Sequence, residues 1–178
     1  MGGGRRSLLA LICAAQAMAG CGNGSSSPAA PAGRAASSPA PTTRSQYIGE
    51  GDAVCRAAVD SLKHRQKKID AAARAEQVND TAANRTVLAA ALRAEVGRAQ
   101  PQLDQLRALT PPPSDRVVIA KYLAGVAGQI TLVDQLATAI DSNDSSTFKV
   151  VGQQLTVGKA EVRGLAQGYG FKICGSAK

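Results

Sequence analysis

Four stretches of apolar residues spaced three or four apart constrain this chain more than any other feature of its sequence. Such spacing places the apolar side chains on one face of an α-helix, and no alternating strand pattern competes with it. The stretches run from about 51 to 77, 82 to 109, 115 to 140 and 146 to 167. Turn-forming and capping residues separate them. These are Asn79-Asp80-Thr81, then Pro111-Pro112-Pro113-Ser114, and then the run from Asp141 to Ser145. We therefore predict an all-α fold, an up-down-up-down four-helix bundle, over residues 47–178.

The inner faces of these helices are expected to form the core. Their apolar positions are Val54, Ala58, Leu62, Ile69 and Ala72 or Ala73, then Leu88, Leu92, Val96, Ala99, Leu103 and Leu106, then Ile119, Tyr122, Val126, Ile130, Val133 and Ile140, and finally Phe148, Val151, Leu155, Val162, Leu165 and Tyr169. Pro101 does not fit this pattern, because a proline inside a helix removes a backbone hydrogen bond and clashes with the preceding turn. We expect it to kink or split the second helix.

The N-terminal segment indicates export. Arg5 and Arg6 precede a short apolar run from 7 to 19, too short for a permanent transmembrane helix. The sequence Ala19-Gly20-Cys21 behind it resembles the bacterial lipobox, which implies a lipoprotein signal peptide over 1–20 and a lipidated Cys21. The protein would then be anchored in the cell membrane on its extracytoplasmic face. Two alternatives stay open: an ordinary cleaved signal that leaves Cys21 as a free thiol, and an uncleaved anchor.

Residues 21–46 are expected to form a tether behind the lipidated cysteine. The segment is rich in Gly, Ser, Pro, Ala and Thr and has no apolar periodicity. Such a composition buries too little surface to offset its ordering entropy, so we predict a disordered spacer. Its hydroxyl side chains could instead carry sugars.

Two cysteines remain outside the leader and the anchor. Cys55 lies near the start of the first predicted helix and Cys174 just beyond the fourth. Exported proteins with two such thiols most often pair them. An even number of antiparallel helices would bring the two to the same end of the bundle, whereas three or five would separate them. We predict a Cys55–Cys174 disulfide; two buried free thiols are the alternative.

The C-terminal sequence Tyr169-Gly170-Phe171-Lys172-Ile173-Cys174-Gly175 resembles the tail of small secreted and lipid-anchored helical proteins of high-GC Gram-positive bacteria. The Leu-rich second helix running into three prolines, and an N-terminal Cys55, are similar to that group as well. The proteins are mostly uncharacterised. The resemblance therefore implies location, fold and a disulfide, and it transfers no activity.

Several function classes are excluded by composition. Four of the 21 basic residues lie in the leader and tether, so the net charge of +8 falls to +4 in the folded part. These charges are interspersed and Trp is absent, which argues against a nucleic-acid partner. The chain has one His, His64, and no Gly-x-Ser-x-Gly sequence, so we expect no metal site, no cofactor and no serine triad.

A hydrolase built on carboxylates alone is a further alternative, which two carboxylates facing one pocket would support. Six of the thirteen acidic residues lie beside the apolar stripes and not within them, with Glu95 and Asp134 nearest to the core boundary. They are Asp70, Glu76, Glu95, Asp104, Asp134 and Glu161.

The third predicted helix carries more apolar surface than one inner face needs. Between 117 and 133 the only formal charge is Lys121. We reject a membrane span here, because the segment is slightly short and contains polar residues. Burial of the helix on a wide face would explain this apolarity. The functional alternative is a candidate surface for a partner or an apolar ligand around Val118, Tyr122, Leu132 and Phe148. Two pairs of glycines, Gly125 and Gly128 with Gly152 and Gly158, would let the third and fourth helices approach closely.

These observations predict a non-enzymatic, lipid-anchored binding or scaffolding module that contacts another envelope protein or a small apolar ligand. A passive structural lipoprotein that spaces the cell surface is the alternative.

Overall fold

The computed structural model describes residues 42–176, which are helical with no strand among them. The helices are α1 (Arg44–Val78), α2 (Ala82–Ala108), the short 3-10 helix η2 (Pro113–Asp115), α3 (Arg116–Asp141) and α4 (Ser145–Tyr169). The all-α prediction is confirmed. The described residues contain five helices and not four, because one 3-10 turn with proline at its first position precedes α3. The predicted signal peptide, Cys21 and the tether up to residue 41 lie outside the described residues.

The start of α1 differs from the sequence prediction. The helix begins at Arg44, about two turns before the predicted start near 51. Thr43 and Gln46 form a capping box there: Gln46 N donates to the Thr43 hydroxyl at 3.3 Å, and Thr43 N donates to Gln46 Oε1 at 2.8 Å. Residues 44–46, which the sequence assigned to the tether, therefore lie in α1.

Two of the other long helices, α2 and α4, have the side-chain caps that the sequence indicated, whereas α3 follows Asp115 without a side-chain cap, so the cap expected from Ser114 does not form. Thr81 caps α2, and the Asp144 carboxylate accepts the backbone N–H groups of Ser146 and Thr147 at 3.0 Å at the start of α4. The hydrogen bond from the Thr147 hydroxyl, together with these backbone bonds and that from the Ser146 hydroxyl, holds the pKa of Asp144 below its usual range. α2 is a single helix through the exposed Pro101, so the predicted split does not occur.

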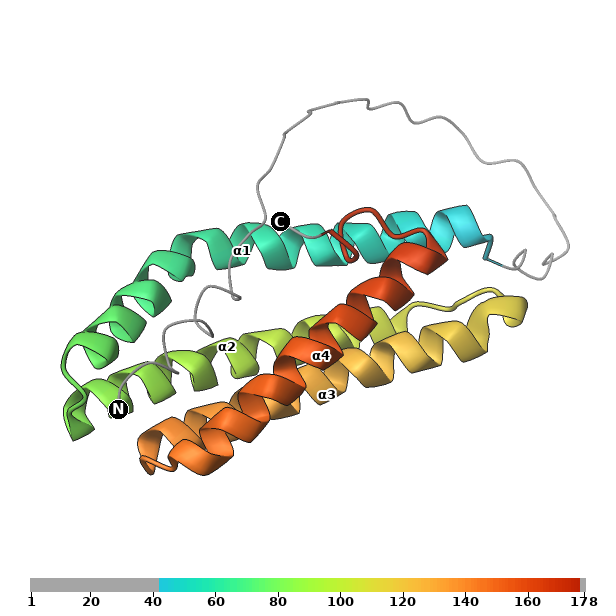
Figure 1. Ribbon diagram of the computed structural model, residues 1–178. Helices are drawn as coiled ribbons and strands as arrows, with labels where there is room; N and C mark the ends of the chain where they lie inside the picture. The colour runs from blue at the N-terminus through green and yellow to red at the C-terminus, as the bar shows by residue number, and fades with distance from the viewer. Residues whose placement is uncertain (1–41, 177–178) are drawn as a thin grey trace, which may run out of the picture.

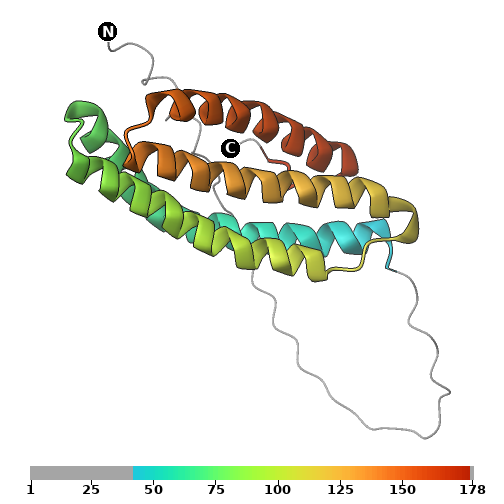
Figure 2. The ribbon, with the colours of Figure 1, turned by 90° about the horizontal axis from the view of Figure 1, so that it is seen from below.

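Helices that follow one another in the chain pack against one another. α1 packs along α2, α2 along α3, and α3 along α4. Figure 1 shows α1 bending near its middle, while α4 crosses the molecule obliquely and ends near the start of α1. In Figure 2, α3 lies between α4 and α2. α1 and α4 meet at one end, where the rings of Tyr47 and Tyr169 are in contact, but they do not pack along each other over their length.

A disulfide joins the first and last parts of the fold. Cys55 in α1 is bonded to Cys174, 119 residues later, as predicted. One turn earlier in α1, the buried Asp52 carboxylate accepts the backbone N–H groups of Lys172, Ile173 and Cys174 at 2.8, 2.8 and 3.1 Å. The tail after α4 is therefore held against α1, as Figure 1 shows in red.

An aromatic cluster closes the same end of the molecule. The rings of Tyr47, Tyr122 and Tyr169 surround Phe171, with ring centroids 5.2–6.1 Å apart. Burial raises the pKa of Tyr122 to about 12. Burial, followed by the hydrogen bond that its hydroxyl donates to Asp115, raises the pKa of Tyr169 to about 12 as well.

Asp115, at the end of η2, is buried beneath this cluster. Arg44 donates to both of its carboxylate oxygens, Nε at 2.9 Å and Nη2 at 2.6 Å, and the Tyr169 hydroxyl donates to it at 3.0 Å. These bonds, that of Arg44 first, hold the pKa of Asp115 well below its usual range. The first residue of α1 is thereby bound to the start of α3 and the end of α4.

The hydrophobic core is divided into two clusters. The first lies at the disulfide end and consists of Tyr47, Leu106, Ile119, Tyr122, Ala166, Tyr169 and Phe171. The second lies toward the α1–α2 turn and consists of Ala72, Ala73, Leu88, Ala89, Leu92, Ala137 and Ile140, with Val133, Leu136 and Phe148 packed against it. Leu88, Leu92 and Ile140 of the second cluster also line a cavity between the helices.

Candidate ligand-binding cavity

A cavity of about 400 Å³ lies in the middle of the helix array and is partly open to solvent. All four long helices contribute to its wall. Its volume is in the range of small-molecule binding sites, which are usually concave, mostly apolar and lined by a few polar groups. It is therefore the candidate functional site of the described residues.

The wall of the cavity is predominantly apolar. The larger apolar side chains that line it are Leu62, Ile69, Leu88, Leu92, Val133, Leu136, Ile140, Phe148 and Leu155. Several positions expected in the core, among them Ala58, Leu62, Ala99 and Leu155, are only half-buried because they face this space. The predicted apolar faces do point inward, but in the middle of the molecule they line a cavity.

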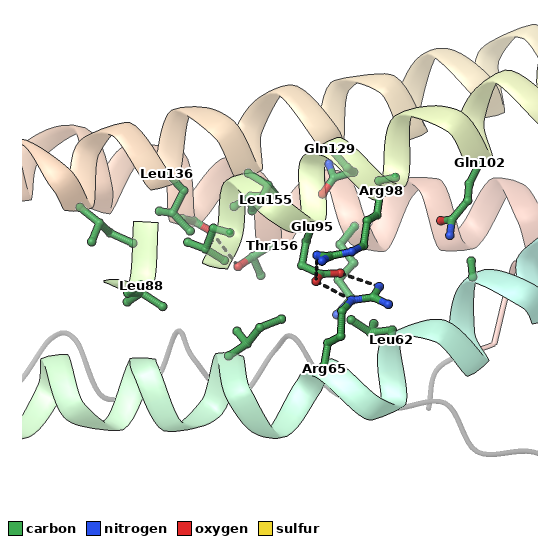
Figure 3. Close-up of a pocket in the computed structure, with 18 of the residues that line it drawn as sticks. Leu62, Arg65, Leu88, Glu95, Arg98, Gln102, Gln129, Leu136, Leu155 and Thr156 are labelled. Carbon is green, nitrogen blue, oxygen red and sulfur yellow. Dashed lines mark hydrogen bonds and ion pairs between the residues drawn. The ribbon is translucent and has the colours of Figure 1, made fainter. Parts of the chain in front are cut away.

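Charged and amide side chains occupy one part of the wall (Figure 3). Arg65 of α1 and Glu95 of α2 form a two-pronged ion pair, with Nε–Oε1 at 2.8 Å and Nη2–Oε2 at 2.9 Å. Arg98 donates to the same carboxylate at 3.0 Å. The hydrogen bond to Glu95 raises the pKa of the Arg65 guanidinium. Glu95 thus links α1 and α2 at the edge of the cavity.

Close contact between α3 and α4 depends on glycine. A Cβ at Gly125 would lie 2.7 Å from a methyl group of Val162, and a Cβ at Gly158 would overlap the amide of Gln129. The predicted close approach of these helices is therefore present at Gly125 and Gly158. A Cβ at Gly128 would meet nothing within 4 Å, so this glycine is not required for it.

The four residues predicted to form a partner or ligand surface are distributed over different environments. Tyr122 is buried in the aromatic cluster, and Val118 packs against the first core cluster. Leu132 is half-buried. Phe148 is half-buried, packs against the second core cluster and lines the cavity. The structure thus brings one of the four to the cavity and places two at the disulfide end.

The sequence analysis did not assign most of the polar side chains of the cavity wall to a site. Those that it missed are Arg65, Arg98, Gln102, Gln129, Thr156 and Lys159. A signal was present, because Arg65 follows Leu62 by three residues and precedes Ile69 by four, which places it within an apolar stripe. Gln129 likewise interrupts the most apolar helix. Polar residues at core-facing positions are the informative exceptions in such a pattern.

Two carboxylates, Glu76 and Glu95, line the same cavity. Arg65, which faces Glu95, lies eleven residues before Glu76 in α1, or about 16 Å along the helix axis. The paired carboxylates of glycoside hydrolases are about 5–10 Å apart. Glu76 and Glu95 are therefore too widely spaced to act as such a pair. Among the described residues, no group of three or more His, Cys, Asp or Glu side chains is placed to hold a metal ion.

The stretch Pro113–Asp141, which comprises η2 and α3, is long and apolar enough to cross a membrane by length and composition. It packs between α2 and α4, and its side chains Val133, Leu136 and Ile140 line the cavity. Only 11% of its most apolar window is buried. Helix packing and the cavity wall therefore account for only part of the apolarity of α3.

No protein-family model matches the chain, and no match was found among curated proteins or among solved structures. The chemistry of the cavity is therefore inferred from its lining.

Proposed function

We propose that this protein is a lipid-anchored, extracytoplasmic binding module, without enzymatic activity, that holds a small apolar ligand between its four long helices. The observation that carries the proposal is the cavity of about 400 Å³, whose wall is mostly apolar and is built by all four helices. A passive spacer has no use for such a space, because filling the core would stabilise it further.

The architecture we propose for the module is an up-down-up-down four-helix bundle that is open between α1 and α4. Three observations support it: the connections between long helices are short, consecutive helices pack together, and Cys55 is bonded to Cys174. In this arrangement the disulfide and Asp52 close one end, and a ligand enters along the open side.

The location we propose is the outer face of the cell membrane, with lipidated Cys21 as the anchor and the residues after it as the tether. The disulfide supports export, because such bonds persist in oxidising compartments. A cavity for an apolar ligand also suits a protein held close to a lipid surface.

Binding is tested with N-phenyl-1-naphthylamine, an uncharged probe whose fluorescence rises in apolar surroundings. The full chain carrying Cys21→Ser, which cannot be acylated at that residue, should bind the probe saturably. Ala99 lines the cavity on α2, and Ala99→Trp should abolish binding by filling the space. Ala90→Trp, on an exposed position of the same helix, is the matched control and should bind normally.

Thermal unfolding separates a filled cavity from a damaged fold. Ala99→Trp should unfold at the same or a higher temperature than the parent, since cavity filling commonly stabilises by about 0.5–2 kcal/mol. Ala58→Phe fills the space from α1 and serves if Ala99→Trp does not fold. Absence of saturable probe binding by the parent chain, or normal binding by both filled variants, would refute the proposed function.

A further inference from the structure

The polar and apolar parts of the cavity wall lie at different levels along the helices. Contacts between helices show which residues lie at the same height along the helix axes. Arg65 of α1 contacts Glu95 of α2, and Gln129 of α3 contacts Gly158 of α4. Most of the polar lining lies near these levels: Arg65, Glu95, Arg98, Gln102 and Gln129 are in the right half of Figure 3, with Leu62 among them, and Thr156 is near the middle. Leu88 and Leu136, toward the α1–α2 turn, lie at the opposite end of the same view. The cavity is therefore amphipathic along its length.

The polar part carries an excess of positive charge. Its cations are Arg65, Arg98 and Lys159, and the carboxylate beside the two arginines is that of Glu95. Lys159 already takes part in another interaction, so Arg98 is the cation considered for a ligand. The two-pronged pair with Arg65 occupies both oxygens of that carboxylate. Within the described residues, both hydrogen bonds of Arg98 come from Nη1, so its Nη2 and Nε remain available to a ligand. An anionic group is the natural complement of this part of the wall.

The apolar part has the length of one acyl chain. From Arg65 to Glu76 the wall runs along α1 for about 16 Å, and one leaflet of a hydrocarbon core about 30 Å thick is about 15 Å deep. Ile69, Leu88 and Phe148 are among the side chains that line this part. Glu76, its acidic residue, is 7% exposed and already takes part in an interaction within the chain.

From this polarity, charge and length we infer that the ligand is a single-chain amphiphile with an anionic headgroup. The headgroup lies at Arg98, and the acyl chain extends past Leu88 toward Phe148. The inference rests on the proposed function, since it names the chemical class of the ligand in the same cavity.

The test uses three probes with the same sixteen-carbon tail and different heads: hexadecanoate, hexadecanol and hexadecyltrimethylammonium. Each competes with N-phenyl-1-naphthylamine for the full chain carrying Cys21→Ser. Hexadecanoate should bind about tenfold more tightly than hexadecanol, which corresponds to about 1.4 kcal/mol for one charge-assisted contact. The cationic probe should bind most weakly, because its head meets like charge.

Arg98→Met assigns the headgroup contact, and Arg107→Met is its matched control. Both arginines lie on α2, are about half exposed (47% and 48%), and pair with a carboxylate three residues earlier, but Arg107 does not line the cavity. Arg98→Met should weaken hexadecanoate binding about tenfold and leave hexadecanol binding unchanged. Arg107→Met should alter neither by more than about twofold.

The outcomes separate the inference from the proposed function. If naphthylamine binds saturably but hexadecanoate and hexadecanol compete equally, or if the cationic probe competes best, the cavity binds apolar ligands and the anionic headgroup is wrong. Equal effects of Arg98→Met and Arg107→Met would remove Arg98 from the site. If the naphthylamine itself does not bind, the proposed function fails first.

Discussion

Replacing both bonded cysteines by serine should lower the free energy of unfolding by an amount that the loop length sets. The Cys55–Cys174 bridge closes a loop of 119 residues. In the chain-entropy model, a loop of this length restricts the unfolded chain enough to stabilise the fold by about 5 kcal/mol. Domains of ordinary size are stable by about 5–15 kcal/mol, so the bridge supplies a third or more of the total.

The native structure should nevertheless survive the loss of the bridge. The tail keeps the three hydrogen bonds to Asp52 and the burial of Phe171, and neither depends on the sulfur atoms. Cys55→Ser/Cys174→Ser is therefore expected to retain its helical far-ultraviolet spectrum without urea. Its urea midpoint should fall by roughly 2–3 M, taking a slope of about 2 kcal/mol per molar urea.

Asp52→Asn, made with the disulfide intact, is the companion variant. The carboxylate uses Oδ2 for Lys172 N and Oδ1 for Ile173 N and Cys174 N, so the amide loses the acceptor for one of the three bonds. A hydrogen bond to a charged group contributes about 1.5–3 kcal/mol, so Asp52→Asn should lower the free energy of unfolding by less than the loss of the disulfide does. An unchanged urea midpoint for the double serine variant would refute the loop-closure reasoning. Loss of helix without urea would show that the bridge itself holds the native tail.

Three further outcomes are expected. In a titration followed by phenolate absorbance, all three tyrosines should ionise above pH 10 in the folded protein, with Tyr122 and Tyr169 near pH 12. In urea they should ionise near pH 10. Because the folded state holds these protons more tightly, the stability that the neutral tyrosines contribute is complete below pH 10 and is lost as the pH rises through 12. Gly128→Ala should stabilise by about 0.5–1 kcal/mol in urea unfolding, whereas Gly125→Ala should destabilise, because its Cβ would lie 2.7 Å from a methyl group of α4. Mass spectrometry of the mature N-terminus should find acylated Cys21, and an unmodified cysteine would contradict the anchor.

The sequence was sufficient to predict the four long helices and the disulfide that joins Cys55 to Cys174. The spacing of apolar residues and the residues that end helices are local properties of the sequence. The disulfide was predicted from two remaining thiols and an even number of long helices. The early start of α1 was missed although Thr43 and Gln46 carry a capping-box pattern. That pattern stands at the end of a Pro- and Ser-rich segment, whose composition outweighed it.

The cavity could not be predicted from the same reasoning. Periodicity indicates which face of a helix points inward, but it does not give the distance to the helix opposite. Ala58, Leu62, Ala99 and Leu155 lie on the predicted inner faces, yet they are half-buried because α1 and α4 do not pack along each other. The separation of helices depends on the curvature of α1 and the crossing of α4, which arise from contacts far apart in the sequence.

The tail on which the resemblance was based has a structural role at nearly every position. Gly170 ends α4 with a φ of 111°, Phe171 fills the aromatic cluster, and Cys174 forms the bridge. A Cβ at Gly175 would lie 3.0 Å from the backbone nitrogen of Gln167, so a larger residue there would crowd the end of α4. None of these residues lines the cavity. Proteins that share this tail are therefore expected to share the closed end of the fold, while the residues that decide what is bound lie elsewhere, on the wall around Arg98.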